Sequence, residues 1–151
     1  MKNLKSLSLT TLGGFTLFEL LITISIIGIL TAIASISFSA AQKKGRDARR
    51  MQDIKGIQTA AEQYYSINNF YPSGTSFVNF ANALVTANLM QAAPADPKGA
   101  TYSFQYNVYQ VSLTDYCVCS LLENLTAGNA SATDPCVFAA SSRYFCAKNQ
   151  Q

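Results

Sequence analysis

Few side chains of this sequence could take part in chemistry. They are four cysteines in the last third of the chain and one glutamate, Glu19, inside a long apolar segment. The chain has no histidine, so neither a Ser–His–Asp triad nor a Cys–His nucleophile can be formed from its residues. The sequence also lacks a phosphate-binding loop, a dinucleotide glycine motif and a recognisable set of metal ligands. We therefore expect a protein that is not an enzyme and that needs no cofactor or metal.

The cysteines favour disulfide bonds over a metal site. Their spacing, with Cys117-x-Cys119 followed by Cys136 and Cys146, lacks the C-x₂₋₄-C pairs typical of zinc sites. An even number of cysteines in a small domain is typical of an oxidising compartment outside the cytoplasm. Cys117 and Cys119 alternate on one expected strand and share a face, which hinders a bond between them. Each is therefore expected to bond either Cys136 or Cys146, with zinc coordination and free thiols as the alternatives.

The apolar segment from Phe15 to Phe38 is the most informative stretch of the sequence. The uncharged run after Glu19 extends over residues 20–42. As a helix it is about 34 Å long, more than the roughly 30 Å of a bilayer core. An ionised carboxylate in a spanning helix costs about 2.5–3.5 kcal/mol, so Glu19 is expected either to pair with a cation or to reach the interface from a helix end. The segment predicts one membrane-spanning helix.

Basic residues flank this segment on both sides. Lys2 and Lys5 precede it, and a denser basic cluster follows it, made of Lys43, Lys44, Arg46, Arg49 and Arg50. Counted alone, these charges would place the C-terminal side in the cytoplasm, because loops rich in lysine and arginine tend to stay inside. The cysteines indicate the opposite side.

The residues from Gly14 to Ile22, GFTLFELLI, resemble the cleavage motif in the precursors of type IV pilins and of the pseudopilins of type II secretion. Gly14 would precede the cut, Phe15 would follow it, and Glu19 would be the fifth residue of the mature chain. The resemblance implies that a membrane prepilin peptidase removes the leader and also N-methylates Phe15. It further implies that the subunit then enters a helical filament with these N-terminal helices at its core, and that Glu19 takes part in assembly.

The same resemblance implies how the chain is divided and where it is located. Residues 1–14 would be the leader, 15–42 the transmembrane and filament-core helix, and 43–151 an extracytoplasmic globular domain. The protein would cross the cell membrane once before it enters a cell-surface pilus or pseudopilus. Its implied partners are the prepilin peptidase, further copies of itself, the inner-membrane assembly machinery and membrane lipid. The net charge of +3 gives no direct indication of nucleic-acid binding.

An ordinary signal peptide, cut near residues 39–41, is the alternative reading of this N-terminus. It is disfavoured because its apolar run would exceed the usual 7–15 residues and because Gly13 and Gly14 lie before that run rather than after it.

After the apolar segment, the sequence predicts that the helix continues to Asn68. An apolar stripe repeats every three or four residues and consists of Ala48, Met51, Ile54, Ile57, Ala61 and Tyr64. Tyr71 precedes Pro72 and ends the helix, because the residue before a proline avoids helical geometry. The opposite face carries the basic cluster with Asp53 and Glu62, and it is expected to be solvated or to meet lipid headgroups or another subunit.

The remaining residues predict a short second helix at 77–89 and a small antiparallel sheet. Strands are expected at 102–108, 115–122 and 142–148, with a loop rich in Gly, Asn and Ser at 123–135. A long helix followed by such a sheet is an α+β fold, and it resembles the architecture of pilins.

The resemblance favours a structural subunit of a type IV pilus or of a type II secretion pseudopilus. The alternative is a domain with one membrane anchor that binds a ligand outside the cytoplasm and does not polymerise. A calcium site like that of the major pseudopilins is not expected, because the loop offers only Glu123 and Asp134 as acidic ligands.

Overall fold

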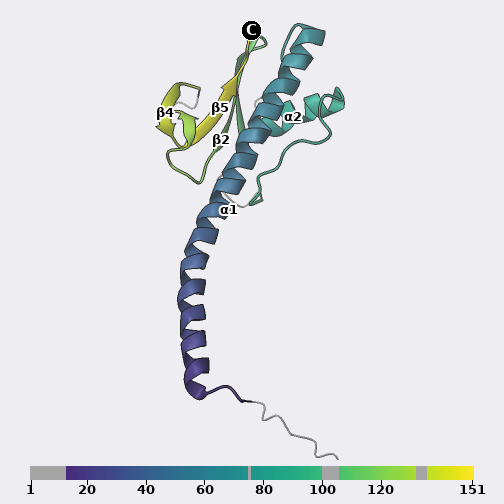
Figure 1. The fold of residues 1–151 in the computed structure, drawn as a ribbon. Helices are drawn as coiled ribbons and strands as arrows, with labels where there is room; N and C mark the ends of the chain where they lie inside the picture. The colour runs from purple at the N-terminus through teal and green to yellow at the C-terminus, as the bar shows by residue number, and fades with distance from the viewer. Residues whose placement is uncertain (1–12, 75, 100–105, 132–135) are drawn as a thin grey trace, which may run out of the picture. The chain divides into compact units, whose positions relative to one another are not determined.

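The structure, a computed structural model, describes residues 13–74, 76–99, 106–131 and 136–151 (Figure 1). The chain has the α+β fold that the sequence predicts, with a long helix, a short helix and one antiparallel sheet. It divides into two compact units, Met1–Ser39 and Ala40–Gln151. The long helix, α1 (Leu17–Asn68, 52 residues), contributes to both.

In the first unit, every described residue is exposed. By length and composition α1 could cross a membrane, as the apolar segment predicts. Hydroxyl side chains in this segment donate to carbonyls of the preceding turn, as Thr23 and Ser25 do to those of Leu20 and Leu21, both at 2.8 Å. Internal hydrogen bonds of this kind allow polar side chains in a helix that has no water around it.

In the second unit, α1 buries the centre of the predicted stripe. Ile54, Ile57 and Ala61 are fully buried, which confirms this part of the pattern. Ala48 is exposed, because the face of the helix at its level is occupied by charged groups described below. The helix ends at Asn68 as predicted, and the next residue, Asn69, has a φ of +61°, the left-handed conformation common at helix ends.

The second helix, α2 (Phe77–Thr86), starts as predicted and ends earlier. The Ser76 hydroxyl caps it by accepting the backbone N–H of Asn79 at 3.3 Å. Asn88, with a φ of +58°, turns the chain and ends the helical geometry that the apolar pattern extended to residue 89.

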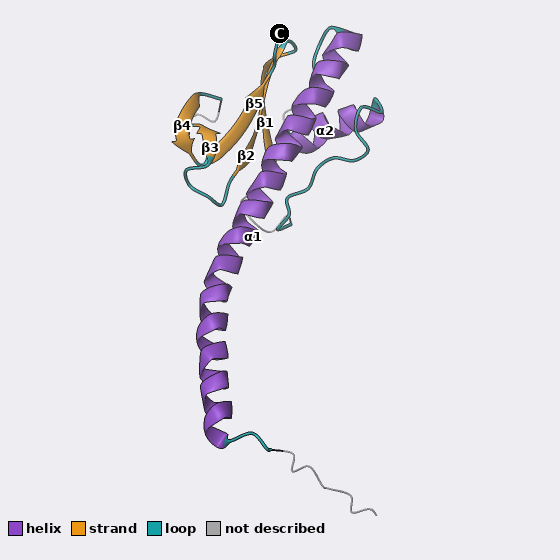
Figure 2. Cartoon of the chain, viewed as in Figure 1, coloured by secondary structure: helices purple, strands orange, loops and turns teal. Residues whose placement is uncertain are grey.

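Five strands form one antiparallel sheet in the order β1-β2-β5-β3-β4 (Figure 2). They are β1 (Tyr106–Ser112), β2 (Asp115–Leu121), β3 (Gly128–Ala130), β4 (Phe138–Ser142) and β5 (Tyr144–Lys148). The predictions of β2 and β5 are confirmed to within two residues. The first predicted strand began at 102, and its residues 102–105 lie outside the described part of the chain.

Two strands of the sheet were not predicted. The segment 123–135, expected to be a loop, contains β3, and a further strand, β4, precedes the turn at Arg143. Apart from Phe138, their residues are small or polar and show no apolar alternation, so no sequence signal separated them from a loop. Gly128 permits this packing, since a Cβ at its position would lie 2.1 Å from the carbonyl oxygen of Tyr144.

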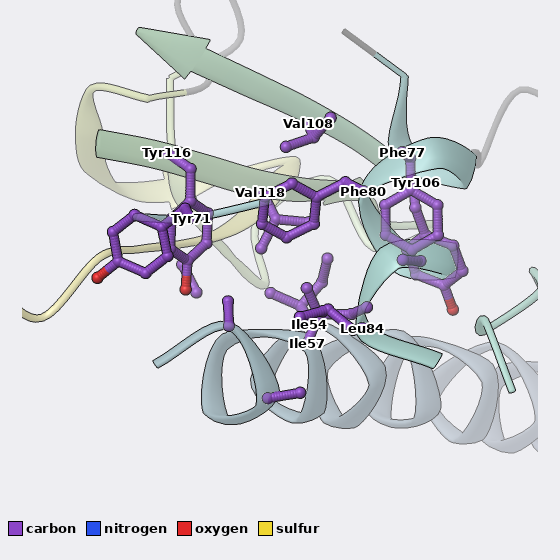
Figure 3. Packing of buried hydrophobic residues seen from close by; sticks show 14 residues of the cluster. Ile54, Ile57, Tyr71, Phe77, Phe80, Leu84, Tyr106, Val108, Tyr116 and Val118 are labelled. Carbon is purple, nitrogen blue, oxygen red and sulfur yellow. The ribbon is translucent and has the colours of Figure 1, made fainter. Parts of the chain in front are cut away.

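The core of the second unit lies between α1, α2 and one face of the sheet (Figure 3). Tyr116 is fully buried in this core, with ring centroids 4.6 Å from Tyr71 and 5.2 Å from Phe80. Tyr106 and Val108 of β1 belong to the same cluster, so this face of the strand is part of the core.

Candidate functional site

The peptide bond between Gly14 and Phe15 lies in an exposed, non-helical segment. Residues 13–16 precede the first turn of α1, and Phe15 is 89% exposed. A Cβ at Gly14 would meet no atom within 4 Å, so the fold itself does not require a glycine there. A requirement for glycine at this position would have to come from a partner that holds the segment closely.

Glu19 and Thr16 together cap the N-terminus of α1. The backbone N–H and the hydroxyl of Thr16 donate to Glu19 Oε2 at 2.9 and 2.8 Å, and the Glu19 N–H donates to Thr16 Oγ1 at 3.2 Å. This reciprocal arrangement is a capping box, and it places a carboxylate at the positive end of the helix dipole. We did not predict a role for Thr16, although the spacing Thr16-x-x-Glu19 is the signature of such a cap.

A cluster of six charged side chains lies around the α1 segment of the second unit. This ionic cluster consists of Arg46, Asp47, Arg50, Asp96, Lys98 and Glu123. Its centre is Arg50, whose side chain is fully buried. Arg50 donates to the two carboxylate oxygens of Asp96 at 2.6 and 3.0 Å. Its Nη1 donates to Asp47 at 2.7 Å and to Glu123 at 3.1 Å.

Glu123 is the acceptor that three cations share. Arg46 donates to its two carboxylate oxygens at 2.6 and 2.8 Å, and the Lys98 ammonium lies 3.0 Å from Oε2. The hydrogen bond from Arg46 holds the pKa of Glu123 well below its usual range. Burial acts in the opposite direction and raises this pKa, but hydrogen bonds from Lys98 and Arg50 lower it further. Burial lowers the pKa of Arg50, but its hydrogen bonds to Asp96, Glu123 and Asp47 outweigh burial and raise it. Glu123 and Arg50 are therefore both charged at neutral pH.

Asp47 ties the helix to the turn after β2. Its two carboxylate oxygens accept the backbone N–H groups of Glu123 and Asn124, each at 2.9 Å. Sequence reasoning assigned this charged face of α1 to solvent, lipid or another subunit, and for Arg46 and Arg50 the assignment to solvent was wrong. Asp47 is only three residues from Arg50, but their other partners, Asp96 and Glu123, lie 46 to 77 residues away in the sequence, so a helical pattern could not reveal these two.

The cysteines lie on the face of the sheet that holds the second, smaller cluster of buried residues. Cys119 and Cys146 are bonded, with an S–S distance of 2.06 Å, and they face each other across β2 and β5. The side-chain amide of Asn129 receives the Cys146 N–H at 2.7 Å and donates to its carbonyl at 3.0 Å. The backbone N–H and C=O of Cys146 therefore point away from β2, and Cys119 and Cys146 form a non-hydrogen-bonded pair. Side chains of such a non-hydrogen-bonded pair approach closely, which suits a cross-strand disulfide.

The prediction that Cys119 bonds one of the two later cysteines is confirmed. Cys117 lies with its Sγ 3.5 Å from that of Cys119, as expected for residues that share a face. Cys117 and Cys136 line the same cavity of about 460 Å³. A disulfide between these two stays a prediction. Zinc is disfavoured because the Cys119 and Cys146 sulfurs are bonded to each other and cannot act as thiolate ligands.

Comparison with known proteins gives one family match and several similar proteins. Residues 13–35 match the family described as the prokaryotic N-terminal methylation motif, and this segment contains Gly14, Phe15 and Glu19. The type IV major pilin protein PilA of Myxococcus xanthus is 35% identical over 68 residues, which are 45% of this chain and 31% of that protein.

Two proteins of another kind are also similar. The type II secretion system core protein G of Pectobacterium carotovorum is 31% identical over 81 residues, 54% of this chain and 50% of that protein. That of Aeromonas hydrophila is 32% identical over 61 residues, 40% of this chain and 43% of that protein. The chain thus spans half or less of the length of these relatives. No solved structure matches it.

Proposed function

We propose that this chain, a member of the type IV pilin and pseudopilin family, is the precursor of a structural subunit that is cleaved and then assembled into a helical filament. The observation that carries the proposal is the N-terminal methylation motif on an exposed peptide bond, directly before a capped apolar helix. The expectation that the chain is not an enzyme agrees with its relatives, which carry the names of a pilin and of secretion-system core proteins.

Processing would begin at the Gly14–Phe15 bond. A prepilin peptidase of the membrane would remove residues 1–14 and with them Lys2 and Lys5, so the mature chain is nearly neutral. The new amino group of Phe15, once methylated, would be a cation close to the first turn of α1. In the precursor, Glu19 already lies at that turn with its carboxylate bound to Thr16.

Assembly would bury the exposed apolar half of α1. Its side chains, including Phe18, Ile22 and Ile29, are 40% or more exposed in the single chain, so a bilayer or neighbouring helices must cover them. A contact between different faces of identical copies, when its rotation does not close a ring, propagates into a helical filament. In that filament, Glu19 would pair with the Phe15 amine of a neighbouring copy.

The location follows from the same steps. Before assembly the subunit would span the cell membrane once, with residues 43–151 outside the cytoplasm, and inner-membrane machinery would extract it into a surface pilus or pseudopilus. The Cys119–Cys146 bond supports an oxidising environment for this part of the chain.

Intact-mass measurement of the membrane-extracted protein tests the proposal. The expected mass corresponds to residues 15–151 with one added methyl group, and sheared surface filaments should contain the same species. A mass that corresponds to cleavage after residue 41 would instead indicate an ordinary signal peptide, and the proposal would fail.

A further inference from the structure

Three exposed cations follow the apolar half of α1 in the sequence. They are Lys43, Lys44 and Arg49, and none forms an ion pair within the described part of the chain. The other two members of the basic cluster, Arg46 and Arg50, are bound to carboxylates inside the second unit. Of the five residues in the basic cluster, two therefore bind carboxylates within the second unit, and three are exposed without such a partner among the described residues.

The three outward cations point in three different directions around the helix. At about 100° of rotation per residue, Lys43, Lys44 and Arg49 are separated by about 100°, 140° and 120°. A protein that docks on a helix contacts one stripe, roughly 100° wide, and would leave at least one of these cations unused. A layer of lipid headgroups can border every exposed side of the helix at once and can therefore reach all three.

We infer that Lys43, Lys44 and Arg49 form a collar that binds the phosphate groups of anionic phospholipids while the subunit is in the membrane. The inference rests on the proposed function, because it requires a membrane-inserted precursor. The apolar segment ends at Phe38, and Lys43 follows five residues later, where the flexible stems of lysine and arginine can extend to the headgroups. Between Glu19 and Asp47 the chain has no acidic residue, and Asp47 is bound to Arg50 and to two backbone N–H groups.

The collar would hold the subunit at one depth until it is extracted. One lysine or arginine near the membrane surface favours binding to an anionic over a neutral lipid by about fivefold, and added salt weakens this preference. Entry into a filament requires that all three contacts with phosphate are given up, so the collar would retain monomers that have not engaged the assembly machinery.

The test uses the full chain in vesicles that contain equal amounts of phosphatidylglycerol and phosphatidylcholine, with a photoreactive analogue of one lipid or the other. The wild type should cross-link to phosphatidylglycerol at least about fivefold more than to phosphatidylcholine. The triple variant Lys43→Gln, Lys44→Gln, Arg49→Gln should show a ratio near one. A matched variant, Lys55→Gln, Arg143→Gln, Lys148→Gln, removes the same charge from exposed residues elsewhere in the second unit and should keep the wild-type ratio.

The inference is overturned if the collar variant keeps its preference for phosphatidylglycerol, or if both variants lose it equally, since net charge alone would then explain the preference. Loss of filaments in the collar variant with an unchanged lipid ratio would assign the cations to a contact between copies instead. The readout needs membrane insertion and no filament. Failure of the collar is therefore distinguishable from failure of the proposed function, which the mass of the processed chain reports.

Discussion

The Arg50 guanidinium binds the Asp96 carboxylate through two hydrogen bonds, of 2.6 and 3.0 Å, and so joins α1 to a segment 46 residues later in the chain. Arg50 is fully buried, and its Nη1 reaches Asp47 and Glu123 as well. With Arg46 and Lys98, the cluster holds three cations and three carboxylates that balance one another. A buried group with several partners of this kind is costly to remove, since its partners are left without compensation.

Replacement of Arg50 by methionine should lower the free energy of unfolding by about 3–5 kcal/mol, because three carboxylates lose their shared buried cation. Urea unfolding of the detergent-solubilised chain measures the change. The neighbouring Arg49 is exposed, and Arg49→Met should change stability by less than about 0.5 kcal/mol. Equal effects of the two variants would show that the ionic cluster does not stabilise the fold.

The stability of the second unit should decrease in acid through Glu123. Its pKa is lowered by folding, chiefly by Arg46, so its contribution is present above the usual value of 4.5 and is lost as the pH falls below it. Glu123→Gln should therefore be less stable than the wild type at pH 7, and the two should converge in acid. Asp115→Asn removes the same charge outside the ionic cluster and should keep the wild-type acid dependence. The measurement is the urea midpoint as a function of pH.

All four cysteines should be oxidised in the mature protein, with Cys117 bonded to Cys136 beside the Cys119–Cys146 bond. The latter closes a loop with a sequence separation of 27, which corresponds to about 3.5 kcal/mol in the loop-entropy model. Thiol labelling of the denatured, unreduced protein should detect no free cysteine, and peptide mapping should recover both pairs. Stoichiometric zinc with four reactive thiols would contradict this prediction.

Glu19→Ala should leave the protein expressed, cleaved and disulfide-bonded, yet retained in the membrane as a monomer. Glu19→Gln should behave in nearly the same way, because the amide keeps the shape and loses the charge that would pair with the Phe15 amine of a neighbour. The loss of one partner from a buried pair costs about 3–5 kcal/mol, and here the cost falls on assembly. The measurement is the yield of sheared filaments relative to subunit retained in the membrane.

A variant of Thr16 distinguishes the proposed charge pair of Glu19 from its role in capping the helix. Thr16→Ala removes the capping hydroxyl, keeps the Glu19 charge and should cost only about 0.5–2 kcal/mol of helix stability. If Thr16→Ala abolishes filaments as completely as Glu19→Gln does, the capping box rather than the charge pair is what assembly requires.

Gly14→Val should block removal of the leader. The fold leaves open space around Gly14, so the branched side chain would clash with the protease subsite and not with the chain itself. The intact mass should then correspond to residues 1–151, while the second unit keeps the wild-type urea midpoint. Normal processing of Gly14→Val would argue against this cleavage site.

The elements that depend on neighbours in sequence could be predicted from the sequence alone. The stripe with Ile54, Ile57 and Ala61 and the stop before Pro72 define the second half of α1, because helical periodicity and the geometry before proline act within a few residues. The motif around Gly14, Phe15 and Glu19 is likewise local. The cap by Thr16 is local as well, because the spacing Thr16-x-x-Glu19 places a hydroxyl and a carboxylate within reach of each other's backbone N–H groups.

Contacts between distant segments were decided by the tertiary structure. The fully buried Arg50 looked like part of a solvated basic face until the fold brought Asp96 and Glu123 to it. The sequence allowed Cys119 to bond either Cys136 or Cys146, and the register of β2 against β5 places Cys146 opposite it. The physical reason is the same in both cases. The charge of a guanidinium and the reactivity of a thiol are properties of one residue. Burial and pairing depend on contacts between distant segments of the chain, and no local sequence pattern specifies which segments come together.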